Sequence, residues 1–195
     1  LKELEEVDPD YASFFYSFLL FELINLIRSS RNLKKPIEQK NINIADGVKT
    51  GGDIVNTKRI KNSAFLAFLD DNDLDELINY ANVRLFSAGE YITLEGTKSD
   101  GINILLKGKV EASFTNLKDD QIENNSRSIA RPGVALSLSA GLHDIESPYS
   151  LKSTRDTTIL KFSNEFIDNL IKTNSELAIK FFKRQLWQLS RYIQS

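Results

Sequence analysis

The chain has 195 residues, of which 41% are hydrophobic and 27% charged, and its formal net charge is −2. This length suits one domain with an extension, while the slightly acidic balance argues against a nucleic-acid surface or a polybasic membrane patch. The absence of cysteine excludes disulfides, thiolate metal sites and a cysteine nucleophile, and is expected of a cytoplasmic protein. The absence of methionine is expected of a segment from a longer chain.

An apolar run from Tyr11 to Ile27 predicts a helix near the N-terminus. Asp8 supplies an N-cap and Pro9 a first-turn proline, so the helix should extend from Pro9 to about Ser29. The run is shorter than the ~20 apolar residues that span a membrane, so packing is favoured over a truncated membrane segment. Apolar side chains surround most of the helix, which predicts burial on several sides, either within the chain or in a dimer. The candidate interaction residues here are Phe14, Phe18 and Phe21.

Residues 31–57 form a polar stretch without sustained periodicity, which is typical of a linker or an arm. The next stretch, residues 58–81, has two apolar groups at helical spacing and predicts helices, the second capped by Asp71 or Asn72. The acidic run at 70–76 lacks the glycine and the glutamate that a calcium loop has at its sixth and twelfth positions. We therefore assign this run to helix capping.

From residue 82 to residue 114, short apolar stretches alternate with polar residues and are separated by glycine turns. This pattern predicts antiparallel strands that are buried on one face. Val83 and Leu85 should face the core in the first strand, and Gly108 is interpreted as a turn between two later strands. Residues 116–126 should form a polar hairpin tip. Further strands are predicted near 127–129, 149–153 and 158–162.

Two helices are predicted at the C-terminus. Ser163 should cap the first, and Ser175 should start the second, which covers residues 176–193. Along the second helix, apolar residues recur at alternating spacings of three and four, like the seam of a coiled coil. This C-terminal seam consists of Ile179, Phe182, Leu186, Leu189 and Ile193. Core packing and a dimer interface explain it equally well, so the last four are candidate interaction residues.

Four motifs occur in order along the predicted strands: Gly89-Glu90, Glu95-Gly96, Asp100-Gly101 and Gly108-Lys109-Val110. Together with residues 65–81, the strand at 156–160 and the final helices, they resemble the cyclic-nucleotide-binding domain family over residues 60–195. The resemblance implies a mainly β fold, an antiparallel β-roll of the jelly-roll type flanked by N-terminal and C-terminal helices. The expected organisation is a helix at 1–30, a linker at 31–57, and a domain at 58–195. Within that domain we expect leading helices at 58–81, the roll at 82–163 and helices at 164–195.

In that family a phosphate-binding cassette holds the ligand: a Phe-Gly-Glu-x-Ala-Leu motif opens a short helix and an Arg-x-Ala motif follows. The corresponding segment here, residues 132–149 (the cassette), has no Phe-Gly-Glu. Counting back from Asp156, the arginine position falls on Ser147 and the alanine position on Tyr149. Among the nearby cations at 127, 131, 152 and 155, Arg131 is the best substitute because it directly precedes the cassette. The residues that the resemblance places at the ligand are Arg131, Gly133, Ala135, Leu136, Ser137, Leu138, Ser139, Ser147 and Tyr149.

With its cassette altered, the chain is predicted to be a non-enzymatic regulatory or scaffolding module. It would act by protein–protein interaction, as a homodimer or on a larger protein. No nucleophile–base pair and no metal-ligand set is visible, His143 being the only histidine, and no cofactor or nucleic acid is expected. The alternative is a genuine sensor of cAMP, cGMP or another small anion that signals through its C-terminal helix. The resemblance allows Trp187 in that helix to cap a ligand as a lid, but packing against the roll is favoured for a single tryptophan.

Overall fold

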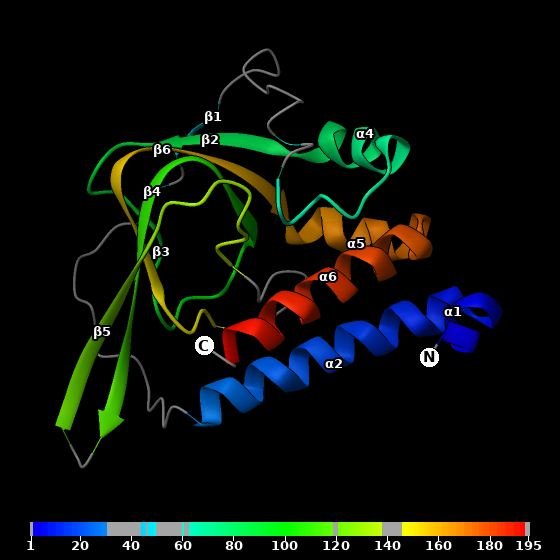
Figure 1. Ribbon diagram of the computed structural model, residues 1–195, viewed down its shortest axis with the longest axis horizontal. Helices are drawn as coiled ribbons and strands as arrows, with labels where there is room; N and C mark the ends of the chain where they lie inside the picture. Colours follow the sequence, from blue (N-terminus) through cyan, green and yellow to red (C-terminus); the bar gives the residue numbers. More distant parts are fainter. Residues whose placement is uncertain are drawn as a thin grey trace.

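The computed structural model describes residues 2–30, 44–45, 47–49, 60, 63–118, 121–137 and 146–193. In these residues the predicted fold is confirmed: an antiparallel sheet curves into a roll, and helices from both ends of the chain pack beside it (Figure 1). Both N-terminal helices and the long C-terminal helix lie on the same side of the roll.

The N-terminal extension consists of two helices, α1 (Lys2–Val7) and α2 (Pro9–Ser30). The predicted cap of α2 is present, because the Asp8 carboxylate accepts the backbone N–H of Tyr11 at 3.0 Å. The short helix α1 before it was not expected from the sequence. Among the described helices, none combines the length and the apolar character that crossing a membrane requires.

A hydrogen-bonded cluster ties α1 and α2 to the C-terminal helix α6 (Ser175–Ile193). The Glu5 carboxylate accepts hydrogen bonds from the Tyr16 hydroxyl and from Lys183 Nζ, the latter at 2.9 Å. Burial raises the pKa of Glu5, but the two hydrogen bonds outweigh it and bring that pKa below its ordinary value. Burial and the Glu5 carboxylate raise the pKa of Tyr16 to about 12. The cluster therefore stabilises the fold above the ordinary pKa of a glutamate, and this contribution is lost as the pH falls through the lowered pKa of Glu5.

The sheet contains six strands in the described residues, and all pairings between them are antiparallel. The strand order is β1-β2-β6-β4-β5, with β3 paired to β6 as well. The strands are β1 (Val48–Lys49), β2 (Asn82–Phe86), β3 (Tyr91–Thr93), β4 (Gly101–Lys118), β5 (Gln121–Ile129) and β6 (Ser150–Ser163). Part of the predicted linker at 31–57 thus joins the sheet as β1, and most of that linker lies outside the described residues.

The long strands β4 and β6 correct two predictions. The sequence pattern divided each of them into two shorter strands, but each is continuous and the two pair along most of their length. Gly108 lies inside β4 at a bulge, where the register against β6 shifts, and not in a turn between strands. Its φ is 106°, and a Cβ there would lie 2.5 Å from Thr157 Oγ1 and 2.7 Å from the Asp156 carbonyl oxygen. Only glycine fits this bend of the strand.

The hairpin of β4 and β5 extends away from the body of the molecule (Figure 1). Its ladder continues from Val110 opposite Ile129 to Lys118 opposite Gln121. The hairpin predicted at 116–126 is present, but most of these residues belong to its two paired strands and not to a loop at the tip. Strand β2 also differs from prediction: Val83 is buried as expected, whereas Leu85 is exposed.

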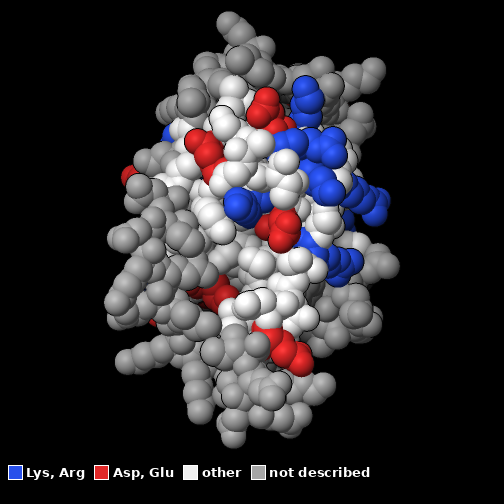
Figure 2. All heavy atoms as spheres, turned by 90° about the vertical axis from the view of Figure 1, so that its left-hand side faces the viewer, with Lys and Arg blue, Asp and Glu red and all other residues white. Residues whose placement is uncertain are grey.

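The side of the roll that lies to the left in Figure 1 carries charges of both signs, with basic side chains gathered on one part of it and acidic ones among them (Figure 2). The ladder between β4 and β6 places such residues opposite one another. Lys109 lies opposite Arg155, so two positive charges face each other there. Further along the ladder, the acidic Glu111 lies opposite the basic Lys152.

In the described part of the segment before the roll, Ile60 and the helix α4 (Asp71–Tyr80) are helical. The cap of α4 is Asp70 and not Asp71 or Asn72, because the Asp70 carboxylate accepts the N–H of Asp73 at 2.9 Å. Residues 63–69 form successive tight turns instead of the predicted helix, and the N–H groups of Leu66 and Leu69 bond carbonyls three residues back. In the described part of the chain, no group of acidic and histidine side chains is arranged to hold a metal ion.

The C-terminal helices α5 (Asn164–Thr173) and α6 follow β6 directly, and Ser163 caps α5 as predicted. Helix α6 lies along α2 (Figure 1). Phe182 and Leu189 of the C-terminal seam are buried in one apolar cluster with Ala12, Tyr16 and Ile24 of α2. Leu186 is half-buried against the same cluster, while the side chain of Ile193 lies outside the described part. The chain itself therefore covers the seam as far as Leu189.

Candidate functional site

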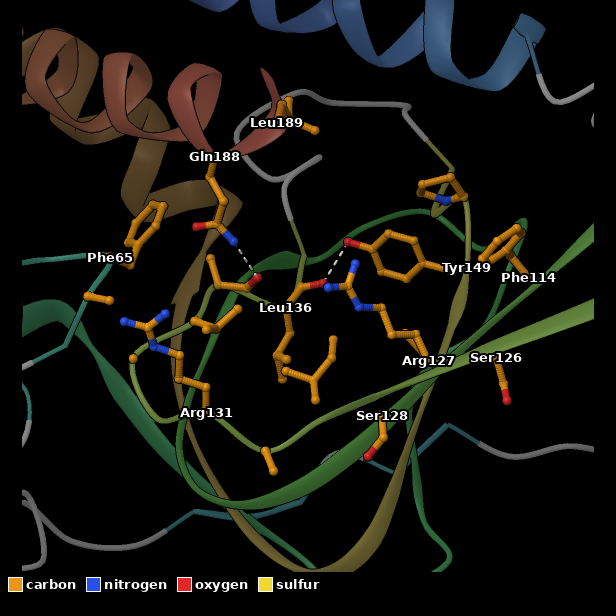
Figure 3. Close-up of a pocket in the computed structure, with 18 of the residues that line it drawn as sticks. Phe65, Phe114, Ser126, Arg127, Ser128, Arg131, Leu136, Tyr149, Gln188 and Leu189 are labelled. Atoms are coloured by element: carbon orange, nitrogen blue, oxygen red, sulfur yellow. Dashed lines mark hydrogen bonds between the residues drawn. The ribbon is translucent and has the colours of Figure 1, made fainter. Parts of the chain in front are cut away.

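A cavity of about 1030 Å³ opens between the roll and helix α6 (Figure 3). This volume is at the upper end of the about 300–1,000 Å³ range of small-molecule sites. Its walls come from α2, the turns before α4, strands β4 and β5, the cassette and α6. The described lining residues are Ile24, Ala64, Phe65, Ala112, Phe114, Asn125, Ser126, Arg127, Ser128, Ile129, Ala130, Arg131, Gly133, Val134, Ala135, Leu136, Pro148, Tyr149, Arg184, Trp187, Gln188 and Leu189.

The front half of the cassette is held against strand β4 by backbone hydrogen bonds. Gly133 N–H donates to the Leu105 carbonyl at 2.6 Å, and Leu136 N–H donates to the Asn103 carbonyl at 2.6 Å. In return, Leu105 N–H donates to the Val134 carbonyl at 3.0 Å. Backbone amides bind a phosphate only when they point at it without another partner. At Gly133 and Leu136 the amides are already paired inside the protein.

Gly133 connects the cassette to the turns before α4. Its carbonyl accepts the N–H of Phe65 at 2.9 Å and the hydroxyl of Ser63 at 3.2 Å. The two backbones approach closely, since a Cβ on Gly133 would lie 2.4 Å from the Ala64 nitrogen. Gly133, which was predicted at the ligand, therefore lines the cavity and also allows the cassette to pack closely against residues 63–65.

The two described serines of the predicted site do not line the cavity. The Ser137 hydroxyl donates to the Gly101 carbonyl at 3.0 Å and accepts the N–H of Asn103 at 2.9 Å. Ser147, at the family's arginine position, is 3% exposed, and its hydroxyl donates to the Tyr149 carbonyl at 2.7 Å. Both hydroxyl groups are thus engaged in hydrogen bonds with nearby backbone groups. Leu138, Ser139 and His143 lie outside the described residues.

The other predicted residues do meet at the cavity: Arg131, Ala135, Leu136 and Tyr149 line it together with Gly133. The Tyr149 hydroxyl donates to the Leu136 carbonyl at 2.6 Å and so bridges the two ends of the cassette (Figure 3). Arg131 extends along the wall toward the part of the cavity near Phe65.

Arg127 is one of the nearby cations that the sequence analysis passed over in favour of Arg131. It lies on β5 directly opposite Ala112 of β4, and residues so paired share one face of a sheet. Figure 3 shows its guanidinium directed into the cavity toward the Tyr149 hydroxyl and the Leu136 carbonyl. The signal was present in the sequence, because the alternation in residues 127–129 puts Arg127 on the same face as the apolar Ile129.

Helix α6 contacts both the cassette and residues 63–69, through two side chains that are four residues apart on the helix. Gln188 Nε2 donates to the Ala135 carbonyl at 2.9 Å, and the Arg184 guanidinium donates to the Ala64 carbonyl. Arg184 also stacks on the ring of Trp187, with its Cζ 4.0 Å from the ring centroid. Trp187 is 45% exposed and lines the cavity.

No family model matches the sequence, and none of the curated proteins matches it by sequence. Solved structures do match it. One is a cyclic nucleotide-binding domain from Methylobacillus flagellatus, with a TM-score of 0.63 and 15% identity over 75% of this chain and 84% of that one. Another is the catabolite activator protein of Thermus thermophilus, with a TM-score of 0.55 and 22% identity over 67% of this chain and 58% of that one.

A third similar structure is the regulatory subunit of a cAMP-independent protein kinase A from Trypanosoma brucei, in a mutant form bound to cAMP. Its TM-score is 0.55, with 19% identity over 70% of this chain and 48% of that one. At these identities the similarity concerns the fold. The resemblance inferred from the order of the glycine motifs is thereby confirmed as a resemblance in three dimensions.

Proposed function

We propose that this chain, which has the fold of cyclic-nucleotide-binding domains, is a non-enzymatic regulatory module that does not bind cAMP or cGMP in the way usual for that fold. The observation that carries the proposal is the state of the described part of the cassette, residues 132–137 and 146–149. The amides of Gly133 and Leu136 bond strand β4, and a buried serine occupies position 147.

The physical argument concerns the single negative charge of a cyclic phosphate. In the family pattern an arginine fork and backbone amides neutralise that charge, and charge-assisted hydrogen bonds of this kind are each worth about 1.5–3 kcal/mol. Ser147 has no charge, and its hydroxyl already donates to the Tyr149 carbonyl. Position 147 therefore offers a cyclic phosphate no ionic partner to compensate for the hydration that it would lose.

One of the similar structures supports regulation without cAMP on this fold. The kinase from which the Trypanosoma brucei subunit comes is described as cAMP-independent, and the cAMP-bound form of that subunit is a mutant. A regulatory role on this fold therefore does not require that the natural chain depend on cAMP.

Calorimetric titration of the chain with cAMP and with cGMP, up to millimolar nucleotide, tests this proposal. We expect heats no larger than those of dilution for either nucleotide. A cyclic-nucleotide-binding protein titrated in the same buffer serves as the positive control. A saturable heat with a stoichiometry near one nucleotide per chain would overturn the proposal.

We further infer that the module acts by self-association through the outward face of α2. The inward face of α2 packs on the C-terminal seam, so the seam is covered within the chain. On the outward face, Tyr11 is 57% exposed and Phe18 is 49% exposed. Phe14 and Phe21 complete the same repeat by their spacing of three and four, although their side chains lie outside the described part. A repeat of this kind packs well against a second copy of itself.

Replacing Phe18 with glutamate is expected to convert a dimer into a monomer, because it places a charge in the apolar contact. Sedimentation velocity measures the oligomeric state, and urea unfolding should find the stability of the monomer unit little changed. Val7→Glu is the matched control, because Val7 is 83% exposed but lies on α1 and not on α2. A wild-type chain that sediments as a monomer at high concentration would contradict self-association.

A further inference from the structure

The strongest unassigned feature of the cavity is its charge. The described lining residues include three arginines and no aspartate or glutamate. Of the three, Arg127 is directed into the interior, whereas Arg131 extends toward the part near Phe65 (Figure 3). Arg184 donates to the Ala64 carbonyl and stacks on Trp187. One guanidinium therefore points into the space that a ligand would occupy, in surroundings that favour an anion.

The rest of the cavity is lined mainly by apolar and aromatic side chains. Figure 3 shows Leu136 and Tyr149 next to the Arg127 side chain, with Phe114 beyond Tyr149. Trp187 and Leu189 of α6 also line the cavity. Such walls favour the body of a ligand that is itself apolar, because its transfer from water is favourable by about 25 cal/mol per Å². The cavity thus combines one inward cation with apolar walls.

The number of available donors separates a carboxylate from a phosphate. A phosphate group needs several donors around its oxygens, and the amides of Gly133 and Leu136 are paired with strand β4. A single guanidinium presents two parallel N–H groups, which match the two oxygens of a carboxylate. One arginine therefore matches the single charge and the two oxygens of a carboxylate, whereas a phosphate monoester carries a further charge and a third oxygen that it leaves unmatched.

We propose that the cavity binds a small amphipathic carboxylic acid, with an aromatic or aliphatic body, and that Arg127 holds its carboxylate. This inference rests on the proposed function in one respect, since it takes the cavity not to be a cyclic-nucleotide site. The acid would occupy the cavity that Gln188 and Trp187 of α6 also line, so its binding would be sensed by this helix.

The chain provides its own probe, because Trp187 is its only tryptophan and lines the cavity. The experiment is a fluorescence titration, excited at the tryptophan band, with 3-phenylpropionate and with octanoate. Their neutral amides, 3-phenylpropionamide and octanamide, are the matched ligands without charge. We expect a saturable change with at least one of the acids, at a concentration at least tenfold lower than with its amide.

Arg127→Gln is expected to weaken binding of the acid at least tenfold, and Arg127→Lys is expected to lose less, because it keeps the charge but not the fork. Arg155→Gln is the matched control, since Arg155 is exposed on β6 and does not line the cavity. It should bind like the wild type. Urea unfolding of each variant verifies that the fold is retained, as expected for exposed arginines.

The outcomes separate this inference from the proposed function. Absence of saturation by either acid, equal binding of acid and amide, or an Arg127→Gln variant that binds like the wild type would overturn the carboxylate site. If the acids fail and cAMP also fails to bind, the proposed function stands alone. If cAMP saturates the cavity and neither acid binds, both are overturned. If the acids and cAMP both bind, only the proposed function is overturned.

Discussion

Replacing Phe182 with alanine is expected to lower the free energy of unfolding by about 3–5 kcal/mol, the usual cost of removing a buried aromatic ring. Phe182 is 0% exposed and lies in the apolar cluster that joins α6 to Ala12 and Tyr16 of α2. The deleted ring would leave a cavity between two helices that hold each other in place. Urea unfolding followed by circular dichroism measures the loss.

Leu186→Ala provides the comparison on the same seam. Leu186 is only half-buried, so its truncation should cost clearly less than that of Phe182. The two variants also distinguish a core from an interface, because a core substitution lowers stability at any protein concentration. A Phe182→Ala chain with unchanged stability and a lost dimer would contradict the placement of the seam inside the chain.

The second large effect is expected at Gly133, where alanine should lower the free energy of unfolding by about 2–5 kcal/mol through strain and overpacking. The residue has a φ of 81°, and a Cβ would meet the Ala64 nitrogen at 2.4 Å and the Ser63 Cα at 2.6 Å. These neighbours are backbone atoms, which do not yield as a flexible side chain would. The substitution should also disturb the hydrogen bond from Phe65 N–H to the Gly133 carbonyl.

Gly89→Ala is the control for the backbone conformation alone. Gly89 has a φ of 93°, but no heavy atom lies within 4 Å of the site of its Cβ. Its replacement should cost about 1–2 kcal/mol, the usual penalty of a left-handed residue with a side chain. Equal losses at the two glycines, measured by the same unfolding experiment, would show that the contact with residues 63–64 contributes nothing.

Features with a local cause could be predicted from the sequence. The caps at Asp8 and Ser163 depend only on a side chain and the amides three residues later, and both are present. The strands of the roll could be predicted because the alternation of apolar and polar residues, and the glycines between them, are also local features. Gly108 was misread because a glycine with positive φ serves a turn or a bulge equally well. Only the partner strand β6, distant in sequence, decides between them.

The site was less predictable because it depends on which face of each strand meets the cavity. Nearness in sequence favoured Arg131, but the pairing of β5 with β4 directs Arg127 inward. Ser137 and Ser147 lie in the expected segment, yet their hydroxyls bond nearby backbone groups. In the same way, the spacing of the C-terminal seam predicted a buried face but not its partner. The structure shows that this partner is α2.

The hydrogen bond from Gln188 to the Ala135 carbonyl means that the cavity already contains a competitor. The amide group is tethered beside its acceptor, so its effective concentration there is far higher than that of any free ligand. A ligand that needs this part of the cassette is bound with an affinity lowered by the cost of displacing Gln188. Conversely, a protein that pulled α6 away from the cassette would raise the affinity of the cavity for that ligand. By thermodynamic reciprocity, the bound ligand would raise the affinity of the chain for that protein by the same factor.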